Sequence, residues 1–100
     1  MKKIILLCAG GMSTSVLVNN MKKEATAQQF NCEIDAYAVD AAKKVGAEAD
    51  CILIGPQIAY KLEEVKKVVP CPVADIDMAI YGMMDGKKAL EMAQKLIGVL

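Results

Sequence analysis

A thiol lies directly before a run of residues that could hold an anion, near the start of the chain. After Cys8 and Ala9 come two glycines, then Met12, and then three consecutive hydroxyl side chains. Glycine permits backbone angles that are closed to other residues, so successive N–H groups can turn inward around a tetrahedral oxyanion. The hydroxyls add further donors. The residues predicted to bind phosphate are Ala9, Gly10, Gly11, Met12, Ser13, Thr14 and Ser15.

Cys8 is the candidate nucleophile of this segment. Free N–H groups and the dipole of a helix starting after the loop both stabilise a nearby thiolate, so we expect Cys8 to react in that form. A thiolate beside a phosphate site can attack phosphorus and form a phosphocysteine whose oxygens the same loop holds. A lone cysteine at a strand end is more commonly a small core hydrophobe. We interpret Cys32, Cys51 and Cys71 in that way, because they open strands at the opposite edge of the sheet.

The chain contains no arginine, and this separates two kinds of phosphate chemistry. Low-molecular-weight tyrosine phosphatases and arsenate reductases place an arginine six residues after the loop cysteine, where this chain has Thr14. Hydrolysis of a phosphocysteine needs strong charge stabilisation and a positioned water, so the lack of arginine favours a phosphoryl carrier. A phosphatase or arsenate reductase on the same loop stays the alternative. A flavin- or anion-binding module with an inert Cys8 is a third hypothesis.

Composition limits the class of protein. One hundred residues, of which 55% are apolar, suffice for one domain, which we place at 1–100. Twelve lysines balance twelve acidic residues, so neither a nucleic acid nor a membrane surface is an expected partner. With no histidine and no C-x-x-C pair, the sequence predicts no metal site and no cofactor. The apolar runs are too short to span a bilayer, and we expect a cytoplasmic protein with free thiols that is a monomer when free.

Short apolar runs alternate with longer segments of helical spacing, as in parallel α/β proteins. The run at 4–8 is apolar on both faces, which is typical of a central strand covered by helices on both sides. Single crossover helices make the strands parallel, and we expect a four-stranded sheet in order 2-1-3-4. The predicted fold is a three-layer α/β sandwich of flavodoxin-like topology without the fifth strand, resembling low-molecular-weight tyrosine phosphatases. Strands are expected at 4–8, 32–39, 51–54 and 72–76, and helices at 13–29, 40–44, 57–69 and 86–99, with Asp40 capping the second helix and Gly46 ending it.

Further candidates lie at the carboxyl ends of the predicted strands, where open parallel sheets bind ligands. Gly55-Pro56-Gln57 follows the third strand and is expected to form a second, partner-facing rim, although a tight turn before a helix explains it equally well. Tyr81 lies in a loop-like stretch after the fourth strand, where packing is favoured over a role in the rim. Asp75 and Asp77 are interpreted as a strand-end residue and a helix cap, not as a general acid or a metal pair.

Three segments together resemble one family. They are the stretch Ile5-Leu6-Leu7-Cys8-Ala9-Gly10-Gly11-Met12-Ser13-Thr14-Ser15, the block Gly55-Pro56-Gln57-Ile58-Ala59-Tyr60, and the block Ile80-Tyr81-Gly82-Met83-Met84-Asp85-Gly86. They resemble the enzyme IIB component of the bacterial phosphoenolpyruvate-dependent sugar phosphotransferase system, lactose/cellobiose class. The resemblance implies that Cys8 accepts a phosphoryl group from a phosphohistidine of the IIA component. It also implies transfer to a sugar of cellobiose, chitobiose or lactose type on the membrane IIC component, through which the protein meets the inner face of the membrane.

Overall fold

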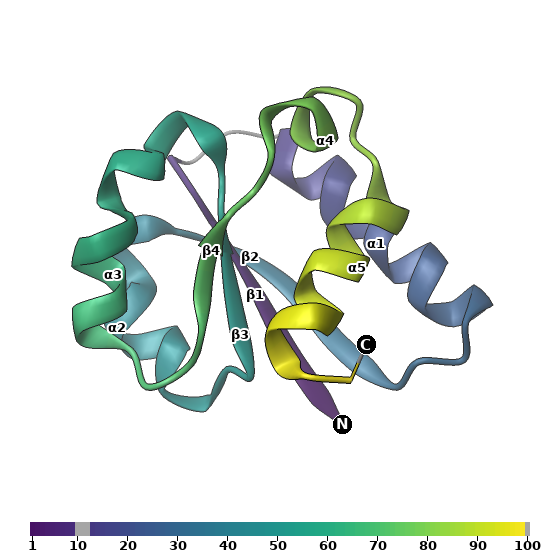
Figure 1. Ribbon diagram of the computed structural model, residues 1–100, viewed down its shortest axis with the longest axis horizontal. Helices are drawn as coiled ribbons and strands as arrows, with labels where there is room; N and C mark the ends of the chain where they lie inside the picture. The colour runs from purple at the N-terminus through teal and green to yellow at the C-terminus, as the bar shows by residue number, and fades with distance from the viewer. Residues whose placement is uncertain (10–12, 100) are drawn as a thin grey trace.

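The described residues form a three-layer sandwich around a parallel sheet (Figure 1). The computed structural model describes residues 1–9 and 13–99, so the expectations for Gly10, Gly11 and Met12 lie outside the described residues. The strands are β1 (Lys2–Cys8), β2 (Cys32–Ala38), β3 (Cys51–Ile54) and β4 (Val73–Asp75). The helices are α1 (Ser13–Ala27), α2 (Ala42–Val45), α3 (Leu62–Val68), α4 (Met78–Gly82) and α5 (Gly86–Ile97), with short 3₁₀ segments at Val39–Ala41, Gly46–Glu48 and Pro56–Lys61.

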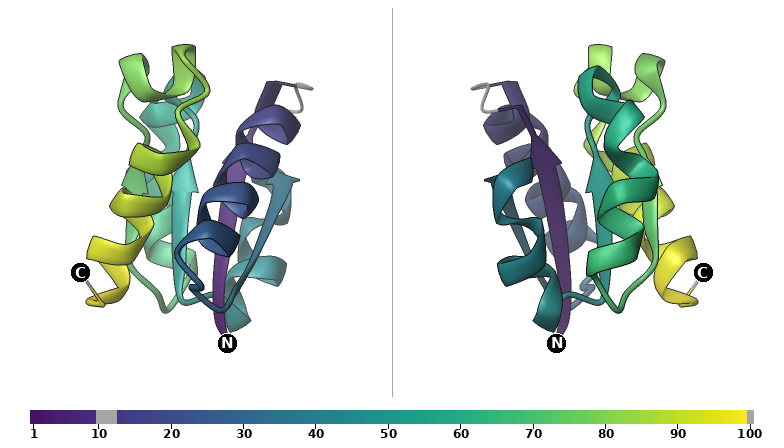
Figure 2. Two further views of the ribbon diagram at one scale, coloured as in Figure 1. Left: turned by 90° about the vertical axis from the view of Figure 1, so that its right-hand side faces the viewer. Right: turned by 90° about the vertical axis from the view of Figure 1, so that its left-hand side faces the viewer.

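The strand order β2-β1-β3-β4, with every pair parallel, confirms the predicted sheet. Helices α1 and α5 cover one face, and α2 and α3 cover the other (Figure 1). Both termini lie at the end of the molecule opposite α4 (Figure 2). The right-handed connection of parallel strands leaves only this arrangement for single crossover helices.

The core explains why β1 is apolar throughout. Successive side chains of a strand point to opposite faces, so Ile4 and Leu6 pack against α1 and α5, while Ile5 and Leu7 pack against α2 and α3. All four side chains are fully buried. A strand with one solvent face would alternate polar and apolar residues, as the edge strand β2 does.

Several predicted boundaries were wrong for local reasons. The helix predicted at 13–29 ends at Ala27, and Gln29, two residues further on, adopts a positive φ of 57°. Asp40 does not cap a helix, because it lies inside a 3₁₀ turn whose N-cap is Ala38. The helix predicted at 57–69 begins as the 3₁₀ segment Pro56–Lys61 and becomes α-helical only at Leu62.

Gly46 is the C-cap of α2, so it ends this helix as predicted, and it also serves packing. Its φ of −74° is open to any residue, and it begins a further 3₁₀ turn. A Cβ at this position would lie 2.5 Å from Cγ1 of Val69. Glycine therefore lets the segment after α2 approach the end of α3.

The three cysteines away from β1 lie at the amino edge of the sheet. Cys51 is fully buried opposite Ile4, which confirms its predicted place in the core. Cys32 and Cys71 are half-buried and pack against the two core clusters, and Cys71 precedes β4 without belonging to it. Burial raises the pKa of the Cys51 thiol to about 12. Burial also raises the pKa of the Cys32 and Cys71 thiols.

We expect alkaline pH to destabilise the protein through Cys51. The unfolded thiol loses its proton near pH 9, whereas the folded thiol keeps it up to about pH 12. Rising pH between these values therefore favours unfolding, by up to about 1.4 kcal/mol per pH unit. Urea unfolding at pH 8, 9, 10 and 11 measures this slope, and Cys51→Ala is the control. Equal slopes for the wild type and Cys51→Ala would contradict the assignment.

Candidate functional site

The topology creates a switch point at the carboxyl edge of the sheet, and we call this region the crevice because parallel α/β proteins bind ligands there. From β1 the chain crosses through α1 to the edge strand β2, and from β3 it crosses through α3 to the opposite edge strand β4. The two crossovers leave on opposite faces, so the strand order reverses between β1 and β3. Cys8 is the last residue of β1 and therefore stands at this switch point.

Cys8 is held on the β2 side of the crevice. Cys8 is 9% exposed, and its Sγ–H group donates a hydrogen bond to the backbone carbonyl of Tyr37 at 3.6 Å. Tyr37 lies on β2, one residue before the ladder partner of Cys8. Only an S–H group can donate this hydrogen bond, so the contact belongs to the thiol form of Cys8.

The start of α1 forms the second side of the site. This 15-residue helix has no acidic residue in its first turn, so no side chain of its own neutralises the positive end of the helix dipole. Ala9 and Ser15 are exposed, whereas Thr14 is buried. The backbone N–H groups at the start of α1 are suited to an anion, because the first four N–H groups of a helix lack partners within it.

The segment after β3 lies on the other side of this switch point. The Gly55 N–H donates to the Leu7 carbonyl at 2.9 Å and so continues the β1–β3 pairing past the end of β3. Gly55 is buried, while Gln57 is exposed. The Gln57 side-chain oxygen would lie 3.3 Å from a Cβ at Gly55, so it folds back over the turn. The structure therefore brings this predicted rim to the same edge as Cys8.

Tyr81 joins the two sides of the crevice. It is 7% exposed and lies in α4, where the sequence predicts a loop, so the prediction that it packs is confirmed and its local structure is corrected. Its hydroxyl shares a buried hydrogen bond of 3.2 Å with the hydroxyl of Thr14. This contact between residues 67 positions apart is absent from the sequence prediction.

Asp75 and Asp77 lie at the end of β4. The Asp77 carboxylate accepts hydrogen bonds from the N–H groups of Ala79 at 2.8 Å and Ile80 at 3.4 Å. Asp77 is therefore a helix cap, as predicted, although the helix that it caps, α4, was not predicted. Asp75 ends β4 opposite Ile54 and is exposed. The cap at Asp77 is the one local signal that could have revealed α4 in the sequence.

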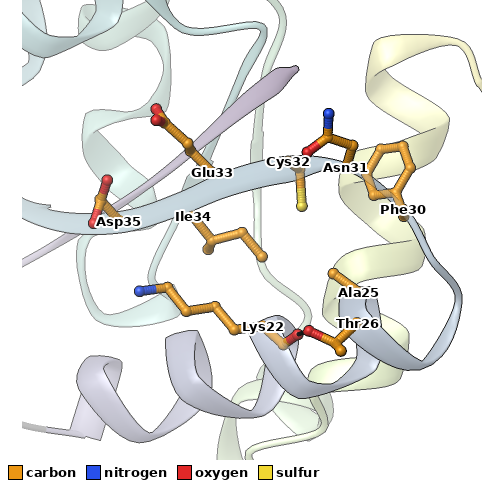
Figure 3. A pocket seen from close by; sticks show the side chains of 9 residues that line it. All are labelled: Lys22, Ala25, Thr26, Phe30, Asn31, Cys32, Glu33, Ile34 and Asp35. Carbon is orange, nitrogen blue, oxygen red and sulfur yellow. Dashed lines mark hydrogen bonds between the residues drawn. The ribbon is translucent and has the colours of Figure 1, made fainter.

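A separate hollow of about 520 Å³ lies between α1 and β2, at the amino half of β2 (Figure 3). Cys32 and Ile34 point toward α1, while Glu33 and Asp35 point away from it (Figure 3). Cys32 pairs with Lys2, six residues along β1 from Cys8. The hollow therefore does not belong to the crevice at the carboxyl edge.

The described residues also bear on metal binding and on membrane insertion. Within residues 1–9 and 13–99, no cluster of three or more acidic, cysteine or histidine side chains is arranged to hold a metal ion. Over the same residues, none of the helices combines the length and the apolar character needed to cross a bilayer.

Fold and site together define a class. The chain is a flavodoxin-like parallel α/β protein with a cysteine at the switch point and a helix N-terminus beside it. Residues 3–92 match the family described as the lactose/cellobiose-specific IIB subunit of the phosphotransferase system (PTS). The chain belongs to this family, as the sequence resemblance predicts, and IIB subunits are phosphotransferases.

Individual relatives agree with this assignment. The chain is 46% identical, over 97% of each chain, to the PTS oligo-beta-mannoside-specific EIIB component of Bacillus subtilis (strain 168). It is 38% identical, over 96% of each chain, to the PTS galactose-specific EIIB component of Lactococcus lactis subsp. cremoris (strain MG1363).

Solved structures confirm the fold. The cellobiose-specific phosphotransferase IIB protein of Borrelia burgdorferi is 34% identical and superimposes with a TM-score of 0.82, over 96% of this chain and 91% of that one. The lactose-specific IIB domain of Streptococcus pneumoniae is 20% identical with a TM-score of 0.83, over 95% and 96% of the two chains.

Proposed function

We propose that this chain carries a phosphoryl group on Cys8 between two components of a sugar phosphotransferase system. The observation that supports the proposal most strongly is the position of Cys8, the last residue of β1, beside a helix N-terminus that no acidic side chain of its first turn neutralises. Backbone N–H groups from Ala9 to Ser15 would hold the phosphoryl oxygens. Membership of the IIB family agrees with this chemistry.

The proposed reaction has two displacements at phosphorus. In the first, the Cys8 thiolate attacks the phosphohistidine of the IIA component, so an S–P bond forms, the N–P bond breaks, and the imidazole nitrogen takes back the electron pair. In the second, a sugar hydroxyl oxygen on the IIC component attacks the phosphocysteine, so an O–P bond forms and Cys8 leaves as thiolate. The proton of the sugar hydroxyl passes to a base of the IIC component.

The absence of arginine supports a carrier over a hydrolase. The chain has no arginine and no histidine, and neither Cys8–Ser15 nor Gly55–Gln57 contains a lysine. A phosphoryl group held by neutral N–H donors is stabilised, but its equatorial oxygens lack the cation that phosphatase loops supply for attack by water. The intermediate is therefore expected to persist until a partner docks.

The proposed partners and location follow from this role. We propose a phosphorylated IIA component as donor and a membrane IIC component with bound sugar as acceptor, which places the chain in the cytoplasm at the inner face of the membrane. Relatives named for oligo-beta-mannoside, galactose and cellobiose support a sugar of the cellobiose or lactose kind. Free in solution, the chain is proposed to be a monomer that exchanges partners.

Incubation with phosphoenolpyruvate and the phosphorylated donor proteins of the system tests the proposal. We expect the wild-type chain to gain one phosphate that iodine releases, and then to lose it to sugar when membranes containing IIC are added. Rapid release of inorganic phosphate from an aryl phosphate would support the phosphatase alternative instead. A yellow protein after purification would support a flavin-binding module.

Exposed apolar side chains are suited to partner docking at this edge. Val16, Tyr37, Tyr60, Met78 and Met83 are all exposed and lie in elements at the carboxyl edge of the sheet. We call these five residues the apolar collar. Met78 is the first residue of α4 and Met83 is its C-cap, and they are 75% and 79% exposed. Flexible methionines can adapt to two different partners.

Met83→Asp is expected to raise the KM for the phosphorylated donor about ten-fold and to leave kcat nearly unchanged. The reason is that a buried charge weakens binding of the donor protein but does not alter the transfer step. The matched control is Val68→Asp, since Val68 is also exposed but ends α3 on the opposite side of the molecule. Transfer kinetics at several donor concentrations measure the split. An unchanged KM for Met83→Asp, or an equal rise for Val68→Asp, would exclude α4 from the docking surface.

A further inference from the structure

The hydrogen bond between Thr14 and Tyr81 joins the start of α1 to a helix from the far end of the chain. Thr14 is 2% exposed and is the second residue of α1, within the segment predicted to bind phosphate. Tyr81 is the fourth of the five residues of α4. A hydrogen bond shielded from water holds its two partners more firmly than an exposed one, because no solvent molecule competes for either group.

Tyr81 also contacts the opposite side of the crevice. Its ring carbon Cε1 would lie 3.9 Å from a Cβ at Gly55, so the ring packs over the turn that follows β3. Gly55 is itself bonded to Leu7 of β1, one residue before Cys8. One side chain therefore spans the switch point, with its hydroxyl on the α1 side and its ring on the β3 side.

We propose that Tyr81 is a positioning residue for phosphoryl transfer. This proposal rests on the proposed function of Cys8. By holding Thr14 and Gly55 at a fixed separation, it fixes the N–H groups at the start of α1 relative to the end of β1. An anion site made of backbone donors works only when those donors are already in place. Tyr81 also couples this site to α4, which carries Met78 and Met83 of the apolar collar.

A second hydrogen bond between the same parts of the chain offers a matched control. The Asn20 side-chain Nδ2 donates to the Met84 carbonyl at 2.9 Å and so ties α1 to the turn between α4 and α5. Asn20 lies six residues beyond Thr14, which is about 9 Å further along the helix. Loss of this bond removes a tether of the same kind without touching the start of α1.

The test compares Tyr81→Phe, Thr14→Val, Thr14→Ser and Asn20→Ala. Tyr81→Phe and Thr14→Val each lose one buried hydrogen bond. We expect both to transfer phosphate to Cys8 about five-fold more slowly at saturating donor. The two changes together are expected to cost no more than either alone, because they remove the same bond. Thr14→Ser keeps the hydroxyl and should recover most of the rate that Thr14→Val loses. Asn20→Ala should keep the wild-type rate despite a similar fall in thermal stability.

Amide hydrogen exchange gives a readout that does not depend on phosphoryl transfer. In Tyr81→Phe, amides in the first turn of α1 past Thr14 are expected to exchange several-fold faster, and in Asn20→Ala they are not. Wild-type transfer and exchange in Tyr81→Phe, or equal slowing by Asn20→Ala, would overturn the positioning role. Failure of the proposed function would show differently, as a wild-type chain that gains no phosphate on Cys8.

Discussion

Cys8→Ser is expected to reduce phosphate incorporation from the phosphorylated donor by about 1,000-fold or more, since removal of a nucleophile eliminates the covalent step itself. Serine is close to cysteine in size, and its hydroxyl can still donate to the Tyr37 carbonyl that receives the Sγ–H bond. The fold should therefore survive the change. The loss would report chemistry, because a serine hydroxyl is almost never ionised near neutral pH whereas a thiolate is accessible there. Intact-protein mass spectrometry after incubation with the donor measures the incorporation.

Cys71→Ser provides the matched control for the Cys8 variant. Cys71 is half-buried and lies before β4 at the amino edge of the sheet, away from the crevice. This variant is expected to gain one phosphate at the wild-type rate, and iodine should release it. A Cys8→Ser protein that still gains one phosphate, or a phosphate mapped to another side chain, would refute the assignment of Cys8.

The features that sequence patterns predicted well are those that depend on burial of whole segments. The apolar run of β1 indicates a strand covered on both faces, and with the crossover helices it predicts the order β2-β1-β3-β4. The order in turn fixes the switch point and places Cys8 at it. The position of Cys8 was therefore predictable, because it depends on the topology and not on any particular side-chain contact.

The features that escaped prediction depend on contacts between distant residues. The five-residue helix α4 is too short for a periodic pattern, and only its cap, Asp77, marks it. The Thr14–Tyr81 bond links residues that are 67 positions apart in the sequence, so no local pattern contains it. The role of Gly46 is similar, since only the fold shows that Val69 lies against it.

Gly86→Ala is expected to destabilise the fold by about 3 kcal/mol, which lowers the Tm of a domain of this size by roughly 15 °C. Gly86 is the first residue of α5 and is buried where this helix crosses α1. A Cβ at Gly86 would lie 2.4 Å from the backbone carbonyl carbon of Asn20 and 2.6 Å from its oxygen. Backbone atoms cannot rotate out of the way, so the two helices must separate, and the core between them loosens. Thermal unfolding followed by circular dichroism measures the shift.

Gly82→Ala separates this effect from the general cost of changing a glycine. Gly82 ends α4, does not adopt a positive φ, and has no atom within 4 Å of the place where a Cβ would lie. Alanine there restricts the unfolded chain without creating a clash, so the variant should equal the wild type or exceed its stability by up to about 1 kcal/mol. A Gly86→Ala protein as stable as Gly82→Ala would mean that α1 and α5 separate at little cost. In that case the Asn20–Met84 and Thr14–Tyr81 bonds, and not the close helix crossing, would hold α1 against the C-terminal half of the chain.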